Sequence, residues 1–244
     1  MYLQDYFGFL VGIVLCMIFS AIANNKVNSS YEKYDKVLAR SGYTGSEAAR
    51  QLMLAYGIYG ISIGRTGGRL TDHYHPTKAI VNLSDSTYNS NSVAALAVAA
   101  HEIGHVMQKQ TGYAFYNIRT ALVPVVNFGS RLAMPLVLVG LLLDFSASVA
   151  SPGVGFNIAM IGVALYGGSL LFALVTLPVE LNASARAKKM LVEQGILHQN
   201  EMEGADKVLG AAALTYLASL LTSLVYFLRF LLRVLAMFGR RDDR

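Results

Sequence analysis

The sequence predicts a mostly α-helical, multi-pass membrane protein that carries a small α+β domain with a short β-sheet. Three observations support this fold class. Of the 244 residues, 54% are hydrophobic and only 14% are charged, which is little charge for a soluble chain of this length. The apolar residues are concentrated in four long segments instead of being spread along the chain. A glycine-punctuated stretch rich in β-branched residues lies between the first two segments.

The first apolar segment, residues 5–23, has no charge after Asp5 and is long enough to span a bilayer. We therefore assign transmembrane helix 1 to residues 1–25. A cleaved signal peptide is the alternative, with Ala21–Ala23 as a cleavage-like site. The N-terminus lacks the basic residues of such peptides, which favours an uncleaved anchor.

Residues 26–130 have the patterning of a soluble domain. Short amphipathic helices are predicted at Asn28–Arg40 and Ser46–Tyr56, the second capped by Thr44 or Ser46. Between Gly57 and Asp85, glycine turns separate three predicted strands: Ile58–Ile63, Leu70–Tyr74 and Lys78–Leu83. A small sheet therefore precedes the helix described below.

The second and third apolar segments, about 132–150 and 154–177, are separated by the turn signal Ser151–Gly153. They predict a transmembrane hairpin over residues 131–177. The only acidic residue in it is Asp144.

A polar stretch, residues 178–207, precedes the fourth segment. Residues 208–244 comprise transmembrane helix 4 and a basic C-terminal end. Arg229 and Arg233 lie at the end of this apolar run and should extend toward the membrane interface.

The residues with the clearest chemistry are His101, Glu102 and His105, spaced H-E-x-x-H. Ser92 is a plausible N-cap, and the alanine-rich Val93–Ala100 is a strong helix former that leads into the motif. On a helix, positions i and i+4 lie on one face, so both imidazoles can bind one cation. Glu102 can then act as general base on a water that Zn²⁺ polarises, which predicts a zinc metallopeptidase.

The alternative without a metal is a purely structural one, in which the two histidines are buried and satisfied by hydrogen bonds. Two histidines and a glutamate on an apolar helix are costly to bury unless they meet something charged, and this favours the metal site.

A catalytic zinc requires a third protein ligand if water is to hold the fourth position. A third histidine nearby is excluded because Gln108 and Thr111 stand where the longer H-E-x-x-H-x-x-G-x-x-H signature would continue. Glu180 is the best candidate. Pro178 is predicted to open a helix there. Asn182 and Arg186 are candidates to orient the Glu180 carboxylate without binding the metal themselves.

The two spans between His105 and Glu180 return the chain to the same membrane face, so this site can close. Glu180 could instead merely complement the N-terminus of its helix. The rival ligands lie in a polar stretch that we interpret as solvated surface: Glu193, Glu201 and Glu203.

Three separated motifs together resemble the bacterial YugP-type neutral zinc metallopeptidases: Ala100–Gln108 around H-E-x-x-H, Leu70–Pro76 with Leu83-Ser84, and Pro178–Ala187. The resemblance covers nearly the whole chain, including the order of the spans. It implies a membrane-embedded endopeptidase with a zincin-like catalytic domain and a gluzincin-type site, with ligands His101, His105 and Glu180 and base Glu102.

Two positions depart from that pattern. Many gluzincins have an aspartate four residues after the ligand glutamate, where this chain has Ser184, so the usual carboxylate partner of the first histidine must come from elsewhere or be absent. Ser184 is nevertheless a candidate to support the ligands, together with Asn182 and Arg186. His75 stands where the family implies an aspartate.

Other polar side chains have weaker predicted roles. His73 is a candidate contact for the substrate or oxyanion, and His73 with His75 could form a second metal site, although such histidines are more often surface residues. Tyr113 and Tyr116 are candidates to stabilise an oxyanion, or to form an interface belt or lid. His198 is predicted to face solvent.

The predicted partners are a lipid bilayer and a protein or peptide substrate, and the sequence does not define an oligomeric state. The net charge of +5 has no aromatic-interleaved basic patch behind it, so nucleic acid is not expected as a partner. The single cysteine, Cys16, rules out a disulfide framework within the chain. Most basic residues near the spans lie on the side of the site, which predicts a bacterial cell-membrane protein with a cytoplasmic site. Three arginines argue the other way: Arg240, Arg241 and Arg244.

Two other function classes fit less well. A non-enzymatic membrane assembly or scaffold protein with a structural zinc would normally close the site with four protein ligands. A metal transporter would need more acidic residues inside the spans than Asp144 alone.

Small residues in the hairpin would let its helices pack closely: Gly140, Gly155, Gly162, Gly167 and Gly168. Because the hairpin connects the H-E-x-x-H helix to Glu180, the zinc is expected near the membrane surface. The expected substrate is then a juxtamembrane segment or a misfolded membrane protein, bound as an extended strand beside Thr71–Tyr74.

Overall fold

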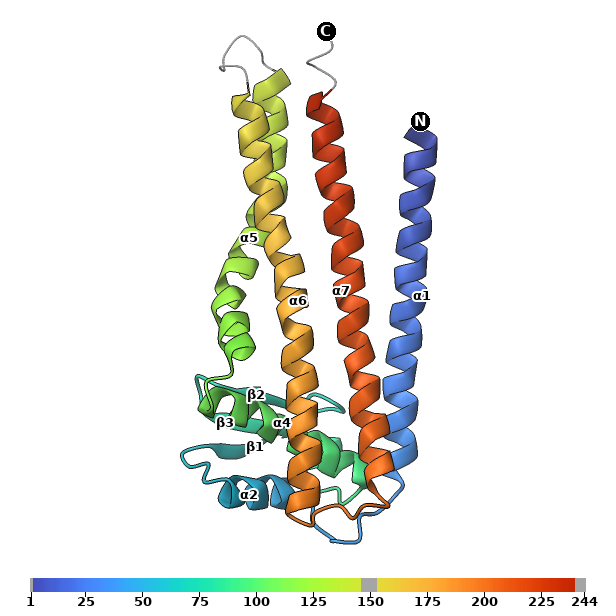
Figure 1. Ribbon diagram of the computed structural model, residues 1–244, viewed down its shortest axis with the longest axis vertical. Coiled ribbons are helices and arrows are strands. Elements are labelled where there is room, and N and C mark those ends of the chain that lie inside the picture. The colour runs from blue at the N-terminus through green and yellow to red at the C-terminus, as the bar shows by residue number, and fades with distance from the viewer. Residues whose placement is uncertain (1, 146–152, 240–244) are drawn as a thin grey trace. The chain divides into compact units, whose positions relative to one another are not determined.

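The computed structural model describes residues 2–145 and 153–239 (Figure 1). It confirms the predicted fold class. Among the described residues, four helices are long and apolar enough to cross a membrane, and one small sheet has three strands. The elements are α1 (Tyr2–Asp35), α2 (Gly45–Ala55), β1 (Ser62–Thr66), β2 (His73–His75), β3 (Ile80–Ser84), α3 (Asp85–Tyr88), α4 (Val93–Gln110), α5 (Ala114–Phe145), α6 (Val154–Glu193) and α7 (Met202–Gly239).

Contacts divide the chain into two compact units. The membrane unit is made of Met1–Phe19, Ile118–Thr176 and Leu217–Arg244, and the α/β unit is made of Ser20–Asn117 and Leu177–Tyr216. In the membrane unit, large apolar side chains are exposed, as lipid-facing ones are expected to be; Phe7 is 69% and Leu142 is 66% exposed. In the α/β unit such side chains form a closed core around α4.

The predicted separate helix at 28–40 is wrong, because α1 continues without a break to Asp35. No proline or glycine occurs between Asn24 and Asp35, so nothing in the sequence ends the helix earlier. The helix is followed by a turn at Lys36 and a bend at Val37, and Leu38 then forms a β-bridge with Ser92.

Helix α2 begins where predicted. Thr44 is its N-cap and forms a capping box with Glu47, in which the Glu47 N–H donates to the Thr44 hydroxyl and the Thr44 N–H donates to the Glu47 carboxylate.

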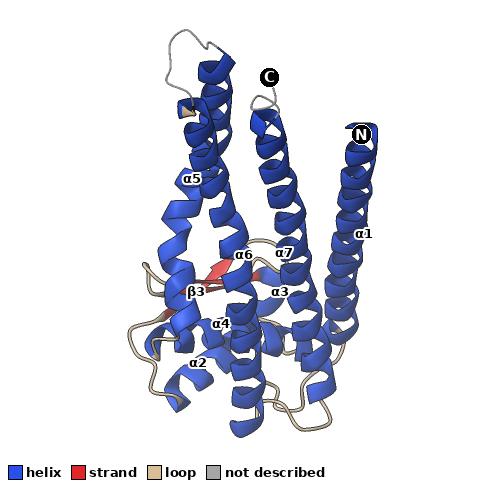
Figure 2. Ribbon diagram, turned by 45° about the horizontal axis from the view of Figure 1, so that its top comes forward, coloured by secondary structure: helices blue, strands red, loops and turns tan. Residues whose placement is uncertain are grey.

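The predicted sheet is present, with its first strand shifted toward the C-terminus (Figure 2). The strand order is β1-β3-β2, with β3 parallel to β1 and antiparallel to β2. Val81 and Leu83 of β3 are fully buried on the core face. Asn82, between them, points to the other face, opposite His73 on β2. Within the described residues, β2 is therefore an edge strand, and it packs against α4.

The prediction that Pro178 opens a new helix is wrong. Helix α6 runs from Val154 to Glu193 with Pro178 inside it. A proline removes one helix hydrogen bond, but neighbouring packing can hold the helix together. Here Val179, Ala183 and Ala187 are fully buried, so that packing is present.

The other spans also differ from the prediction in length. Helix α5 begins at Ala114 and contains Pro124 and Pro135, whereas the apolar segment begins near 132. The predicted end of that span at 146–150, and Ser151 and Pro152 of the turn, lie outside the described residues. Helix α7 begins at Met202, six residues before the predicted span at 208, because a polar first turn precedes its apolar part.

Candidate active site

Helix α4 carries the H-E-x-x-H motif, as predicted. The hydroxyl of Ser92 accepts a hydrogen bond from the N–H of Ala95, at 3.1 Å, and so caps the helix. The same hydroxyl donates to the Asp35 carboxylate at the end of α1, at 2.9 Å. The start of α4 is therefore fixed both by its own cap and by a neighbouring helix.

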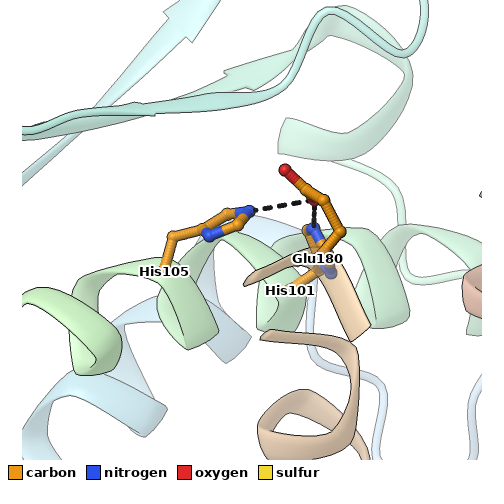
Figure 3. A group of neighbouring side chains, drawn as sticks. All are labelled: His101, His105 and Glu180. Carbon is orange, nitrogen blue, oxygen red and sulfur yellow. Dashed lines mark hydrogen bonds and ion pairs between the residues drawn. The ribbon is translucent and has the colours of Figure 1, made fainter. Parts of the chain in front are cut away.

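His101, His105 and Glu180 come together in the α/β unit (Figure 3). The Nε2 atoms of His101 and His105 lie 3.2 and 3.4 Å from Oε2 of Glu180. One ligand atom from each of the three residues lies within 4.8 Å of the others, so the group could hold a metal ion. Ligands about 2.0–2.1 Å from a tetrahedral zinc lie roughly 3.3 Å apart, so the observed distances fit zinc.

The other ring nitrogen of each histidine also has a partner. His105 Nδ1 lies 3.0 Å from Oε1 of Gln108, which can only accept, so Nδ1 carries the proton. This leaves the Nε2 lone pair of His105 available on the side of Glu180. His101 Nδ1 lies 3.1 Å from the Ser184 hydroxyl. Ser184 thus takes the position expected of an aspartate, and both histidine partners are uncharged.

Gln108 is a site residue that the sequence analysis missed. It is fully buried, and its Nε2 donates to the carbonyl oxygen of Val179, at 2.7 Å, and to Oδ1 of Asn182, at 3.0 Å. Arg186 Nε donates to the same Asn182 oxygen, at 2.8 Å. The spacing from His105 to Gln108, i to i+3 on one helix face, is the signal that could have identified it.

Asn182 and Arg186, which were predicted to orient Glu180, take part in a hydrogen-bond chain toward His105. Their hydrogen bonds lead through Gln108 to His105, which connects the α6 segment that carries Glu180 to the second histidine of α4.

Glycine sets the closest approach of α4 and α6. A Cβ atom added at Gly104 would lie 2.5 Å from the carbonyl oxygen of Ala183. Gly104 is one of the two unspecified positions of H-E-x-x-H, and its lack of a side chain lets the two ligand-bearing helices touch.

Glu102 is buried, with 7% of its surface exposed. Burial raises the pKa of its carboxyl group, and the nearby imidazoles of His105 and His101 oppose this shift. A carboxylate with a raised pKa is a stronger base, as proton abstraction from water requires.

Burial lowers the pKa of His105, but the hydrogen bond and negative charge of Glu180 outweigh it, so the pKa is raised. The group therefore favours positive charge at its centre, which suits a divalent cation as well as a proton.

The structure does not bring His73 or His75 into this group. They lie on the outer face of the sheet, where His73 Nδ1 is 2.9 Å from the Thr71 carbonyl oxygen and Nε2 is 3.1 Å from Asn82 Nδ2. His75 Nδ1 accepts a hydrogen bond from the Lys78 N–H. Among the described residues, no potential metal group contains either histidine.

The remaining candidates are two tyrosines and His198. The ring of Tyr113 is 5.9 Å below the Arg186 guanidinium, and Tyr116 is buried. His198 is exposed, as predicted.

The rival glutamates are outside the metal group as well. Glu203 is exposed, and Glu193 accepts a hydrogen bond from the Tyr56 hydroxyl. The interpretation of Glu201 as solvated surface is wrong. It is buried, and its carboxylate accepts hydrogen bonds from the N–H groups of Arg40 and His198, both at 2.8 Å.

Comparisons with known proteins identify the family of the chain. Residues 9–235 match the family described as "Putative neutral zinc metallopeptidase". A Bacillus subtilis (strain 168) protein described as "Putative membrane protease YugP" is 43% identical over 221 residues, which cover 91% of this chain and 92% of that protein. No solved structure matches. With its membrane-spanning helices and its His101–His105–Glu180 group, the chain belongs to this family of neutral zinc metallopeptidases.

Proposed function

We propose that this protein is a membrane-embedded zinc endopeptidase that cleaves membrane-associated or misfolded proteins. The observation that carries the proposal is the convergence of His101, His105 and Glu180, with the buried base Glu102 beside them in the wall of a cavity. Zinc, when bound by the first three residues, lowers the pKa of a water molecule and polarises the scissile carbonyl group.

Glu102 performs the proton transfers in this mechanism. Its carboxylate takes a proton from the attacking water and later delivers it to the nitrogen of the leaving amine. Ser184 and Gln108 hold the two imidazoles so that both Nε2 atoms stay directed at the same point.

Strand β2 is the proposed binding surface for the substrate backbone. It pairs with β3 on one side, is at the edge of the sheet within the described chain, and packs against α4. An extended peptide added to this edge would form main-chain hydrogen bonds that tolerate many sequences. His73 and the rest of the Thr71–Tyr74 segment would then lie near the peptide.

A structural zinc in a scaffold protein is the competing function. Such a site is usually closed by four protein ligands, whereas only three side chains make up the group found among the described residues. The buried carboxylate of Glu102 next to this group supports a catalytic function over a structural one.

Glu102→Gln tests the activity directly. It keeps the shape of the side chain but removes the base, so we expect kcat/KM on an unstructured protein substrate to fall on the order of 10²–10⁴-fold with zinc content unchanged. Glu203→Gln, the same change at an exposed position, is the matched control. Undiminished turnover by zinc-loaded Glu102→Gln protein would refute the proposal.

The substrate class follows from the short distance along the chain between the membrane unit, which includes Thr176, and the ligand Glu180. We expect substrates tethered to detergent micelles or liposomes to be cleaved severalfold faster than the same peptides free in solution. Equal rates would mean that the spans serve only as an anchor.

We also propose that the site faces the cytoplasm, on the basis of the basic residues around it. Reporter fusions at the short connection between α5 and α6 and at the C-terminus should both report the opposite side.

A further inference from the structure

We propose that the cavity beside Glu102 binds the substrate side chain next to the leaving amine, and that it selects an apolar one. This inference rests on the proposed peptidase function and adds a specificity to it.

The cavity lies within the α/β unit and has a volume of about 380 Å³, which is in the range of specific binding sites (about 300–1,000 Å³). On α4 it is lined by Val98, His101 and Glu102. These positions, i, i+3 and i+4, form one continuous face of the helix, so the cavity is continuous with the catalytic residues.

The remaining walls come from segments far apart in the sequence. Helix α7 contributes a stripe at helical spacing that includes Val208, Leu209 and Ala212, and α1 contributes Val27. Leu70 closes the cavity just before β2. The lining is mixed: these five side chains and Val98 are apolar, and Asn24, Asn28 and Thr215 add uncharged polar groups. A substrate side chain placed against the apolar residues would gain about 25 cal/mol for each Å² of apolar surface buried.

The chemistry of Glu102 determines which substrate residue enters. Its carboxylate must reach the nitrogen of the leaving amine to deliver the proton. The Cα atom of the next residue is bonded to that nitrogen, so its side chain is the one placed beside Glu102. The cavity therefore fits the first residue after the scissile bond.

Two carboxylates exclude an acidic side chain at this position. Asp72 lines the cavity with Glu102. Its two oxygens accept hydrogen bonds from the N–H and the hydroxyl of Ser84, at 2.7 and 2.8 Å. Asp72 is thus held in place, and a second negative charge brought beside it would be repelled.

Cleavage of a peptide library by the full-length, detergent-solubilised zinc protein, read by mass spectrometry, tests the inference. We expect leucine, isoleucine, valine, methionine or phenylalanine directly after the cut, and depletion of aspartate and glutamate. Ala212→Phe fills the cavity and should lower the leucine-to-alanine ratio of kcat/KM on the order of tenfold. Ala213→Phe, the same change on the adjacent helix position outside the cavity lining, should leave the ratio unchanged.

Leu209→Ala enlarges the cavity and should shift the preference toward phenylalanine. A shift in this direction could not be explained by misfolding of the Ala212→Phe variant. Identical cleavage profiles for wild type, Ala212→Phe and Leu209→Ala would overturn the inference, as would a wild-type profile without preference at this position.

Binding separates this inference from the proposed function. Zinc-loaded Glu102→Gln protein should bind a fluorescent hexapeptide with leucine at the position after the scissile bond at least tenfold more tightly than the glutamate peptide. If no peptide is cleaved by wild type but this binding difference is present, the proposed function fails and the cavity assignment holds. Equal binding of both peptides would overturn the cavity assignment.

Discussion

In each of the two units, helix α6 contacts a neighbouring helix closely at a glycine, but the two contacts have different consequences. In the membrane unit, a Cβ atom added at Gly162 would lie 2.6 Å from the carbonyl oxygen of Ala133 on α5. In the α/β unit, a Cβ atom added at Gly104 of α4 would lie 2.5 Å from the carbonyl oxygen of Ala183 on α6. Both contacts bring two helix backbones together, as small residues commonly do.

The surroundings of the two contacts differ. Around Gly162 the neighbours are apolar, such as Val137 and Leu136, so the contact contributes packing alone. The contact at Gly104 is flanked by hydrogen bonds between α4 and α6. His101 bonds to Ser184, and Gln108 donates to Val179 and Asn182. The same backbone approach therefore stabilises a hairpin in one unit and positions the candidate metal ligands in the other.

The largest effect should come from Gly104→Ala. The added methyl group must push α4 from α6, and a displacement of about 1 Å at a catalytic site can cost roughly 10²-fold in rate. We expect weakened zinc binding and a loss of peptidase activity of at least that size, measured by metal analysis and a cleavage assay. Gly210→Ala on α7 is the control, because a Cβ there would meet nothing within 4 Å. A fully active, zinc-loaded Gly104→Ala protein would show that this contact does not set the ligand geometry.

A smaller effect is expected for Gln108→Ala. Without its partner, the His105 ring loses the hydrogen bond that fixes its orientation, which typically costs about 10–100-fold in metal affinity. Competition with a fluorescent zinc chelator measures this. Gln110→Ala, two residues further along the same helix and exposed, should retain wild-type affinity. An unchanged zinc affinity for Gln108→Ala would mean that the hydrogen bonds of Gln108 do not help to position His105 for zinc.

The smallest effect on the metal site should come from Gly162→Ala. The methyl group strains the α5–α6 contact, so the thermal stability in detergent should fall while zinc affinity stays the same. Gly168→Ala, on the same helix, should be tolerated because its Cβ would be 3.9 Å from the nearest atom, in Val126. A loss of zinc in Gly162→Ala alone would mean that the two glycine contacts are coupled through α6.

The sequence predicted the elements whose signals are local. The spans follow from runs of apolar residues, α2 from an N-cap at Thr44 or Ser46, and α4 from Ser92 and the alanines that precede His101. The continuity of α6 through Pro178 was not predictable in this way, because it depends on buried neighbours such as Ala183 that the fold supplies.

The candidate site likewise contains residues that the sequence identifies and features that only the fold provides. His101, Glu102 and His105 are recognisable from their spacing alone, and Glu180 was selected by excluding a nearby histidine. Gln108 was used only for that exclusion, although its place one helical turn after His105 made it a candidate partner. The cavity could not be predicted, since its walls on α1 and α7 are brought to α4 only by tertiary packing.

The bridge made by Gln108 has an evolutionary consequence. The side-chain amide of Gln108 accepts from His105 and donates to Asn182, so neither end can be replaced without leaving a buried polar group unsatisfied. Related sequences that change residue 108 should therefore also change residue 182. A search pattern that extends H-E-x-x-H to H-E-x-G-H-x-x-Q, followed by E-x-N-x-S-x-R, should separate chains with this uncharged support of both histidines from other zinc peptidases.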